Sequence, residues 1–145
     1  MLVHMLGFTL WLGGGMATMV AGVTAKGFTP VERLKAYKLI GAVQRLLVGP
    51  GALGVVLSGI MLSMAFMRSG MMPGWLNGMT GAGLLGALVA VTISVPTAAR
   101  LARLEVDAKG ELPAAFQGLR KRQVIAATVA GSLGLVALFV GTLGR

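Results

Sequence analysis

The side chains best suited to chemistry in this sequence are a lone histidine and a group of methionines. His4 is the only histidine among the 145 residues, and the chain has ten methionines and no cysteine. Imidazole and thioether groups together suit copper(I), and the same pair forms a known axial ligand set for haem iron. The candidate metal ligands are therefore His4, Met5, Met64, Met67 and Met79, and the His4/Met79 pair is also a candidate ligand set for haem b.

Simpler roles compete with these assignments. A histidine one turn from a membrane boundary can hydrogen-bond there, and methionine is an adaptable filler of apolar helices. Arg45 also has two interpretations, because its side chain can reach lipid phosphate or contact an acidic group of a bound ligand. Gln44, beside it, is expected to add little.

Four apolar segments must position these residues. The chain is 56% hydrophobic and 12% charged, whereas soluble domains are about a quarter charged. Each segment can cross about 30 Å of hydrocarbon at 1.5 Å per residue. We expect an all-α bundle of four transmembrane helices that forms one integral membrane domain over residues 1–145, with spans at about 2–24, 46–67, 75–99 and 123–143.

The basic residues predict the orientation of these spans. The formal net charge is +9, and the lysines and arginines cluster in the first and third connections, whereas Arg68 stands alone in the second. Because such residues stay cytoplasmic, both termini should lie outside the cell, in a multi-pass protein of a bacterial inner membrane. We expect the basic residues to contact anionic lipid headgroups and not nucleic acid. His4 and most methionines then share the outer end: Met1, Met5, Met64, Met67, Met71, Met72 and Met79.

Local patterns indicate how the helices begin, bend and pack. Thr29, Pro30 and Glu32 form a capping box that should start an amphipathic cytoplasmic helix leading into the second span. Pro50 and Pro96 should each kink a helix. One face of the first span should point into the bundle, at His4, Gly7, Trp11, Gly14 and Thr18. Small residues should form packing seams at Gly78, Ala82, Gly86 and Ala90, and at Ala126, Ala130 and Gly134.

Two segments resemble known membrane families. The opening HMLGFTLWLGGG and the segment RLLVGPGALGVVLSGIML at residues 45–62 resemble small bacterial proteins of the copper resistance protein D group, related uncharacterised families and membrane-embedded protoporphyrinogen oxidases. The resemblance implies copper handling at the periplasmic face, or haem binding at His4 with Trp11 and Arg45 nearby. The oxidases carry a lysine four residues after a tryptophan, where this chain has Met79 after Trp75. The departure argues against oxidase activity.

Two functions of different classes follow from the sequence. The first is binding of haem b or copper(I) at the outer end of the bundle. The second is an accessory or structural role, in which the glycine and alanine seams pack the chain into a homo-oligomer or a larger membrane complex. The second function rests on the scarcity of polar groups within the spans. No catalytic residues can be named, because the acidic residues and His4 lie on opposite sides, and the sequence favours a protein that is not an enzyme.

Overall fold

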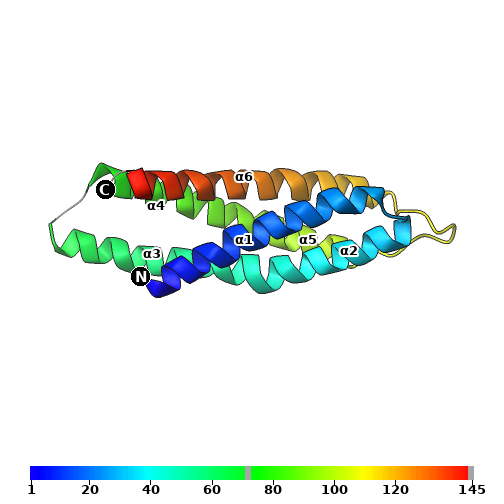
Figure 1. Cartoon of the computed structure of the whole chain (residues 1–145), viewed down its shortest axis with the longest axis horizontal. Coiled ribbons are helices and arrows are strands. Elements are labelled where there is room, and N and C mark those ends of the chain that lie inside the picture. Colours follow the sequence, from blue (N-terminus) through cyan, green and yellow to red (C-terminus); the bar gives the residue numbers. More distant parts are fainter. Residues whose placement is uncertain (71–72, 144–145) are drawn as a thin grey trace.

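A computed structural model describes residues 1–70 and 73–143, and Met71 and Met72 of the outer methionine group lie outside these residues. The described chain is helical apart from short connections, as Figure 1 shows. A short 3₁₀ turn, η1 (Ala25–Gly27), follows the first helix. The α-helices are α1 (Leu2–Thr24), α2 (Pro30–Val43), α3 (Gly49–Arg68), α4 (Gly74–Val89), α5 (Val95–Leu101) and α6 (Ala115–Leu143).

Two π-helical segments join pairs of these helices into continuous rods. The segment η2 (Gln44–Val48) links α2 to α3, and η3 (Ala90–Ser94) links α4 to α5. Within the described residues, four helical stretches are long and apolar enough to cross a membrane: Leu2–Gly27, Pro30–Arg68, Gly74–Leu101 and Ala115–Leu143. The predicted all-α bundle of four membrane-spanning helices is therefore confirmed, and the chain is a multi-pass membrane protein by the length and composition of its helices.

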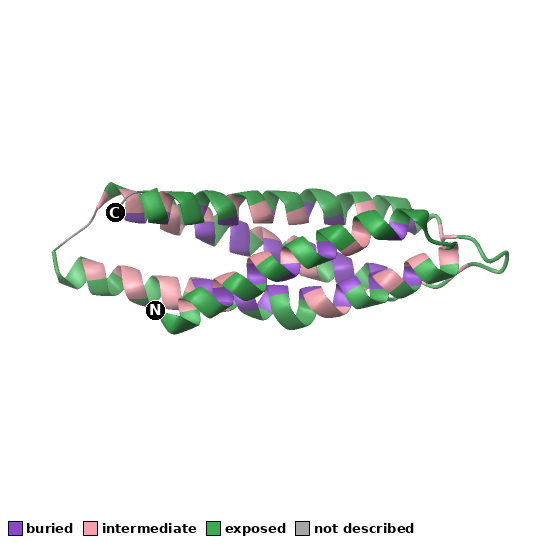
Figure 2. Ribbon diagram, in the orientation of Figure 1, coloured by how far each residue is buried: buried purple, intermediate pink, exposed green. Residues whose placement is uncertain are grey.

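The helices form two closely packed antiparallel pairs. Helix α1 packs mainly against α3, and α4 packs mainly against α6. Figure 1 shows the two chain ends at one end of the bundle and the connection between α5 and α6 at the other. Buried residues run along the inner faces of the helices, and exposed residues cover their outer faces (Figure 2).

Small residues allow the close approach within each pair. A Cβ atom on Gly51 would lie 2.7 Å from the carbonyl oxygen of Gly7 in α1. In the other pair, a Cβ atom on Gly86 would lie 3.1 Å from the carbonyl oxygen of Ala130 in α6. The prediction that Gly7, Trp11, Gly14 and Thr18 face inward is confirmed, since all four are buried, whereas His4 is only partly buried.

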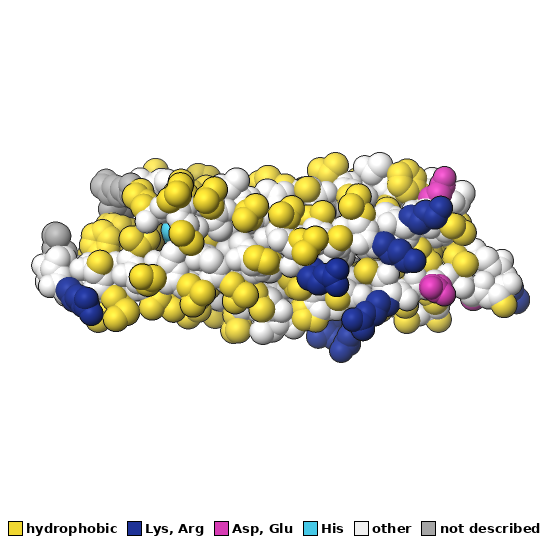
Figure 3. All heavy atoms as spheres, turned by 90° about the horizontal axis from the view of Figure 1, so that it is seen from below, with side chains coloured by type: hydrophobic (Ala, Val, Ile, Leu, Met, Phe, Trp, Pro, Cys, Tyr) yellow, Lys and Arg dark blue, Asp and Glu magenta, His cyan; other side chains and the backbone are white. Residues whose placement is uncertain are grey.

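The amphipathic helix before the second span also has the predicted character. The Thr29 side chain accepts a hydrogen bond from the Glu32 backbone N–H, and the Glu32 carboxylate accepts one from the Thr29 N–H at 3.0 Å, which completes the capping box. Leu34, Tyr37 and Ile40 are buried, whereas the basic residues between them are mainly exposed. Figure 3 shows most basic side chains of one face gathered toward the end that carries this helix.

Candidate ligand-binding cavity between α1 and α6

A cavity of about 350 Å³ lies between α1 and α6. The two helices make few direct contacts, because each packs mainly against another partner. The rim carries exposed apolar side chains from both helices, among them Met16, Met19, Val124 and Leu135. The cavity therefore opens sideways, toward the surface that would face lipid. Its inner wall is formed by residues of the two π-helical segments.

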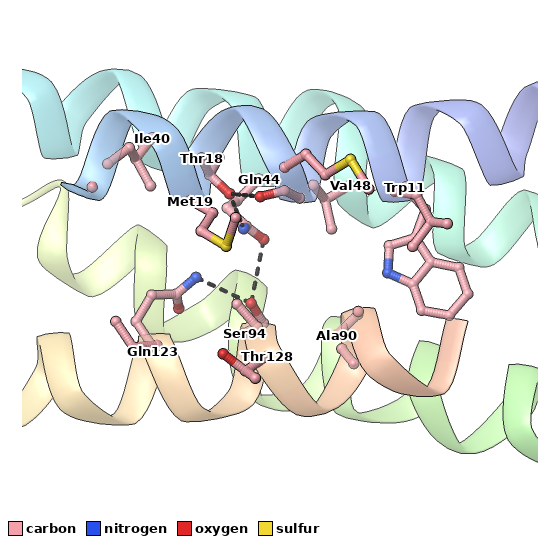
Figure 4. Close-up of a pocket in the computed structure, with 18 of the residues that line it drawn as sticks. Trp11, Thr18, Met19, Ile40, Gln44, Val48, Ala90, Ser94, Gln123 and Thr128 are labelled. Atoms are coloured by element: carbon pink, nitrogen blue, oxygen red, sulfur yellow. Dashed lines mark hydrogen bonds between the residues drawn. The ribbon is translucent and has the colours of Figure 1, made fainter. Parts of the chain in front are cut away.

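Four buried polar side chains form a hydrogen-bonded chain along the inner wall. Gln123 Nε2 donates to Ser94 Oγ at 3.1 Å, and Ser94 Oγ donates to Gln44 Oε1 at 3.4 Å. Gln44 Nε2 donates to Thr18 Oγ1 at 3.1 Å, and Thr18 donates to the carbonyl of Gly15. Figure 4 shows these residues between α1 and α6, with Trp11 toward one end of the cavity and Ile40 toward the other.

The donor-to-acceptor order of these hydrogen bonds leaves one acceptor without a partner. Each hydroxyl group has one proton, and those of Thr18 and Ser94 are both used along the chain. The amide groups of Gln44 and Gln123 are thereby oriented, with each Nε2 as a donor. Within residues 1–70 and 73–143, Gln123 Oε1 is buried and has no hydrogen-bond partner, although its residue lines the cavity. Buried polar atoms are nearly always paired, so this oxygen is suited to receive a donor from a ligand.

The two π-helical segments turn the polar side chains inward. Pro50 follows η2 and Pro96 follows η3 at the same spacing, and neither has a backbone N–H to donate to the preceding turn. We predicted kinks at both prolines, and the structure has a widened turn just before each. Gln44 is 1% exposed although Arg45 beside it is exposed, and Ser94 is also 1% exposed. Widened turns of this kind are frequent at functional sites.

One end of the cavity is basic. Arg120 and Lys26 both line it, together with Tyr37. Arg120 Nε donates to the Tyr37 hydroxyl at 3.1 Å, so Arg120 is held against the bundle. In the sequence, Arg120 is only one of the basic residues that cluster in the third connection.

The predicted histidine site lies elsewhere, in the contact between α1 and α3. His4 Nδ1 is 3.0 Å from Ser58 Oγ, and Ser58 donates its hydroxyl proton to the carbonyl of Gly54. The contact holds Nδ1 against α3, and Nε2 is the ring nitrogen that Ser58 does not engage.

The methionines predicted to accompany His4 have different surroundings. Met5, Met64 and Met67 are exposed on α1 and α3, where they would face lipid. The Met79 sulfur packs on α6, where a Cβ atom on Gly141 would lie 2.7 Å from it. Met79 therefore contacts α6, whereas His4 contacts α3. Among the described parts of the chain, no three His, Asp or Glu residues gather as a metal site.

The two remaining predicted site residues differ in their placement. Trp11 is 2% exposed and lines the cavity, and its ring reaches the glycine seam of α4, where a Cβ atom on Gly86 would lie 3.0 Å from Trp11 Cη2. Arg45 is exposed on η2 and is not among the residues that line the cavity. Its role at a lipid phosphate or a ligand stays a prediction.

The sequence interpretation missed the polar chain. Gln44 was expected to add little, which was wrong, because it joins Thr18 to Ser94 at the centre of the chain. The expected scarcity of polar groups within the spans was also wrong, since Thr18, Gln44, Ser94, Thr97 and Gln123 are buried. A usable signal was present, because an amide side chain in a membrane span should avoid lipid and face the interior.

Comparisons with protein-family models, curated proteins and solved structures found no match for the chain. The resemblance to the copper resistance protein D group and the related families stays a prediction.

Proposed function

We propose that this protein, in a bacterial inner membrane with both termini outside, binds an amphiphilic molecule that enters its cavity from the bilayer. The polar end of the ligand donates a hydrogen bond to Gln123 Oε1, and its apolar part lies between α1 and α6. The function is binding, with no catalytic step assigned to any residue.

The shape and lining of the cavity support this proposal. Its volume of about 350 Å³ lies within the range of about 300–1,000 Å³ found for small-molecule sites. Such sites combine apolar walls with a few placed polar groups, and here Gln44, Ser94 and Gln123 are the polar groups. The sideways opening suits a ligand that is dissolved in lipid.

The observation that carries the proposal is the unpaired oxygen of Gln123. Its residue is 6% exposed, and its amide is fixed by the bond from Nε2 to Ser94. A buried acceptor without a partner costs about 1–3 kcal/mol. A ligand with a hydroxyl or N–H donor would recover that free energy, and a ligand without one would not.

Two probes that differ only in a donor test this proposal. Dodecanol and dodecyl methyl ether share a chain, but only the alcohol can donate a hydrogen bond. We expect the purified protein to bind dodecanol more tightly in native mass spectrometry from a neutral detergent. Replacing Gln123 by methionine keeps the volume and removes the acceptor, and it should weaken dodecanol binding by about tenfold, the equivalent of one hydrogen bond.

The matched control is Gln117→Met, because Gln117 is exposed on the same helix. This variant should bind dodecanol like the unchanged protein. Equal binding of the two probes, or an unchanged affinity in the Gln123→Met variant, would contradict the proposal. Circular dichroism and gel filtration would show that the variants keep the fold.

A second candidate function is binding of haem b or copper(I) at His4. It is favoured by the placement of the His4 ring, because the hydrogen bond with Ser58 holds Nδ1 and Nε2 is the nitrogen that Ser58 does not engage. Protein from its native membrane should then show a Soret band or bound copper, and His4→Ala should remove either signal. The neighbouring Thr9→Ala is the control, since Thr9 is exposed and bonds only to its own helix. Unchanged haem or copper content in His4→Ala would rule out this assignment.

A further inference from the structure

We infer that the ligand of the cavity carries a phosphate group, which is held at the basic end by Lys26, Tyr37 and Arg120. The inference rests on the proposed function and names the chemical class of its ligand. It follows from the donors at this end, from the absence of acidic residues there and from the spacing of Arg120 and Gln123.

The donors at the basic end are already oriented. The bond from Arg120 Nε to the Tyr37 hydroxyl leaves the two Nη groups of Arg120 available to a ligand. Tyr37 is buried, and its ring packs edge-on against Phe116 with centroids 5.1 Å apart. Its hydroxyl accepts from Arg120, and among the described residues no acceptor is shown for its own proton. Both groups can therefore donate to one anion.

Lys26 is on a turn that is itself held in place. Arg33 donates from Nε to the Ala25 carbonyl at 2.8 Å and from Nη2 to the Lys26 carbonyl. These bonds tie the 3₁₀ turn after α1 to the start of α2. The Lys26 side chain stays exposed at the cavity wall, where a flexible ammonium group can meet a charged headgroup.

No acidic residue compensates this charge. The chain has four acidic residues, all of them described, and none lines the cavity. The Glu32 carboxylate is engaged by Thr29, and one carboxylate oxygen of Asp107 accepts two backbone N–H groups of its own loop. An anionic ligand would therefore meet Arg120 and Lys26 without competition from a protein carboxylate.

The spacing along α6 suits a single headgroup. Arg120 and Gln123 are three residues apart and both line the cavity, and such positions are neighbours on one helix face, about 5–6 Å apart at Cβ. A phosphate monoester presents anionic oxygens and, when singly protonated, one hydroxyl donor. The anionic oxygens match Arg120 and Lys26, and the hydroxyl matches Gln123 Oε1. The apolar chain then extends toward Trp11.

The test compares dodecyl phosphate with dodecanol on the full-length protein in a neutral detergent. We expect dodecyl phosphate to bind at least about tenfold more tightly, because charge-assisted hydrogen bonds are the stronger class. Arg120→Gln should remove this preference, so that dodecyl phosphate binds no more tightly than dodecanol. Arg120→Lys should retain part of it, since the charge remains.

Matched variants distinguish binding of the phosphate in the cavity from unspecific attraction to the positively charged surface. Arg122→Gln removes a cation two residues away that lines a different surface groove, and it should leave the preference intact. Lys26→Gln should weaken the binding of dodecyl phosphate. Vesicles that contain phosphatidic acid should compete with dodecyl phosphate, whereas inorganic phosphate at equal concentration should not.

The outcomes keep the two proposals distinct. Equal binding of dodecyl phosphate and dodecanol, with Gln123→Met still weakening both, would overturn the phosphate assignment and leave the proposed function in place. Equal losses in Arg120→Gln and Arg122→Gln would also overturn the assignment, since the attraction would then be unspecific. Competition by inorganic phosphate would overturn it in favour of a soluble anion. Failure of both probes to bind would overturn the proposed function itself.

Discussion

At the scale of single residues, close helix packing depends on the missing side chain of Gly51. A Cβ atom there would lie 2.7 Å from Gly7 O and 2.7 Å from Trp11 N, and both are backbone atoms that cannot rotate away. We therefore expect Gly51→Ala to separate α1 from α3 and to lower the free energy of unfolding by about 1–3 kcal/mol. Thermal or denaturant unfolding of the purified protein in detergent would measure this loss.

Gly13→Ala is the natural control for this prediction. Gly13 is on α1, and no atom lies within 4 Å of a Cβ atom built there. Alanine has the higher helix propensity, so Gly13→Ala should leave stability unchanged or raise it by up to about 1 kcal/mol. A stability of Gly51→Ala equal to that of Gly13→Ala would show that α1 and α3 do not approach as closely as the structure has them.

Residue types alone predicted part of the candidate site. The 100° periodicity of α1 correctly placed Trp11 and Thr18 inside, because a regular helix fixes which side chains share a face. It could not show that Thr18 meets Gln44, since that contact joins residues 26 positions apart in the sequence. The choice of His4 and the methionines weighed side-chain chemistry alone, whereas the cavity depends on how helices pair.

At the scale of elements, the most predictable features were those that depend on residues within one helix turn. The capping box at Thr29 and Glu32 was predicted and confirmed, because its hydrogen bonds span only three residues. The prolines correctly marked where the regular helix is disturbed. The form of the disturbance was not predictable, since a kinked and a π-helical turn both accommodate the missing N–H, and packing against neighbouring helices decides between them.

The π-helical form of these two turns determines which side chains line the cavity. A helix without the extra residue of a π turn would rotate the side chains before it relative to those after it by about 100°. Gln44 and Ser94 belong to the two segments where this rotation occurs, and both are buried in the same hydrogen-bonded chain. The sequence interpretation treated the second span as beginning at residue 46, which left Gln44 outside the bundle, whereas the helix runs without interruption from Pro30 to Arg68.

At the scale of the whole molecule, the distribution of charge predicts which end of the bundle faces the cytoplasm. The chain has no cysteine, so single cysteines can be placed freely. We expect Ser69→Cys, in the connection between α3 and α4, to react with a membrane-impermeant maleimide in intact bacterial cells. Lys109→Cys, in the connection before α6, should react only after lysis, because basic connections stay inside. The opposite pattern of labelling would contradict the proposed orientation.

The number of spans was the most reliable prediction at this scale, because it depends on the length of apolar segments and little else. The pairing of α1 with α3 and of α4 with α6 was not predicted. All spans carry small residues, so several pairings satisfy the same pattern. The wide space between α1 and α6, on which the candidate site depends, follows from that pairing.

Because the cavity opens sideways between α1 and α6, the concentration that sets its occupancy is that of the ligand in the bilayer. A molecule that reaches the cavity from the bilayer never passes through water, and it exchanges with the lipids that border Met16 and Val124. Occupancy would then be governed by the mole fraction of the ligand among lipids, in two dimensions, and the total aqueous concentration would matter only through partitioning. The solvent displaced on binding would be acyl chains, so the hydrophobic effect would add little selectivity, and discrimination would depend on polar groups such as Gln123.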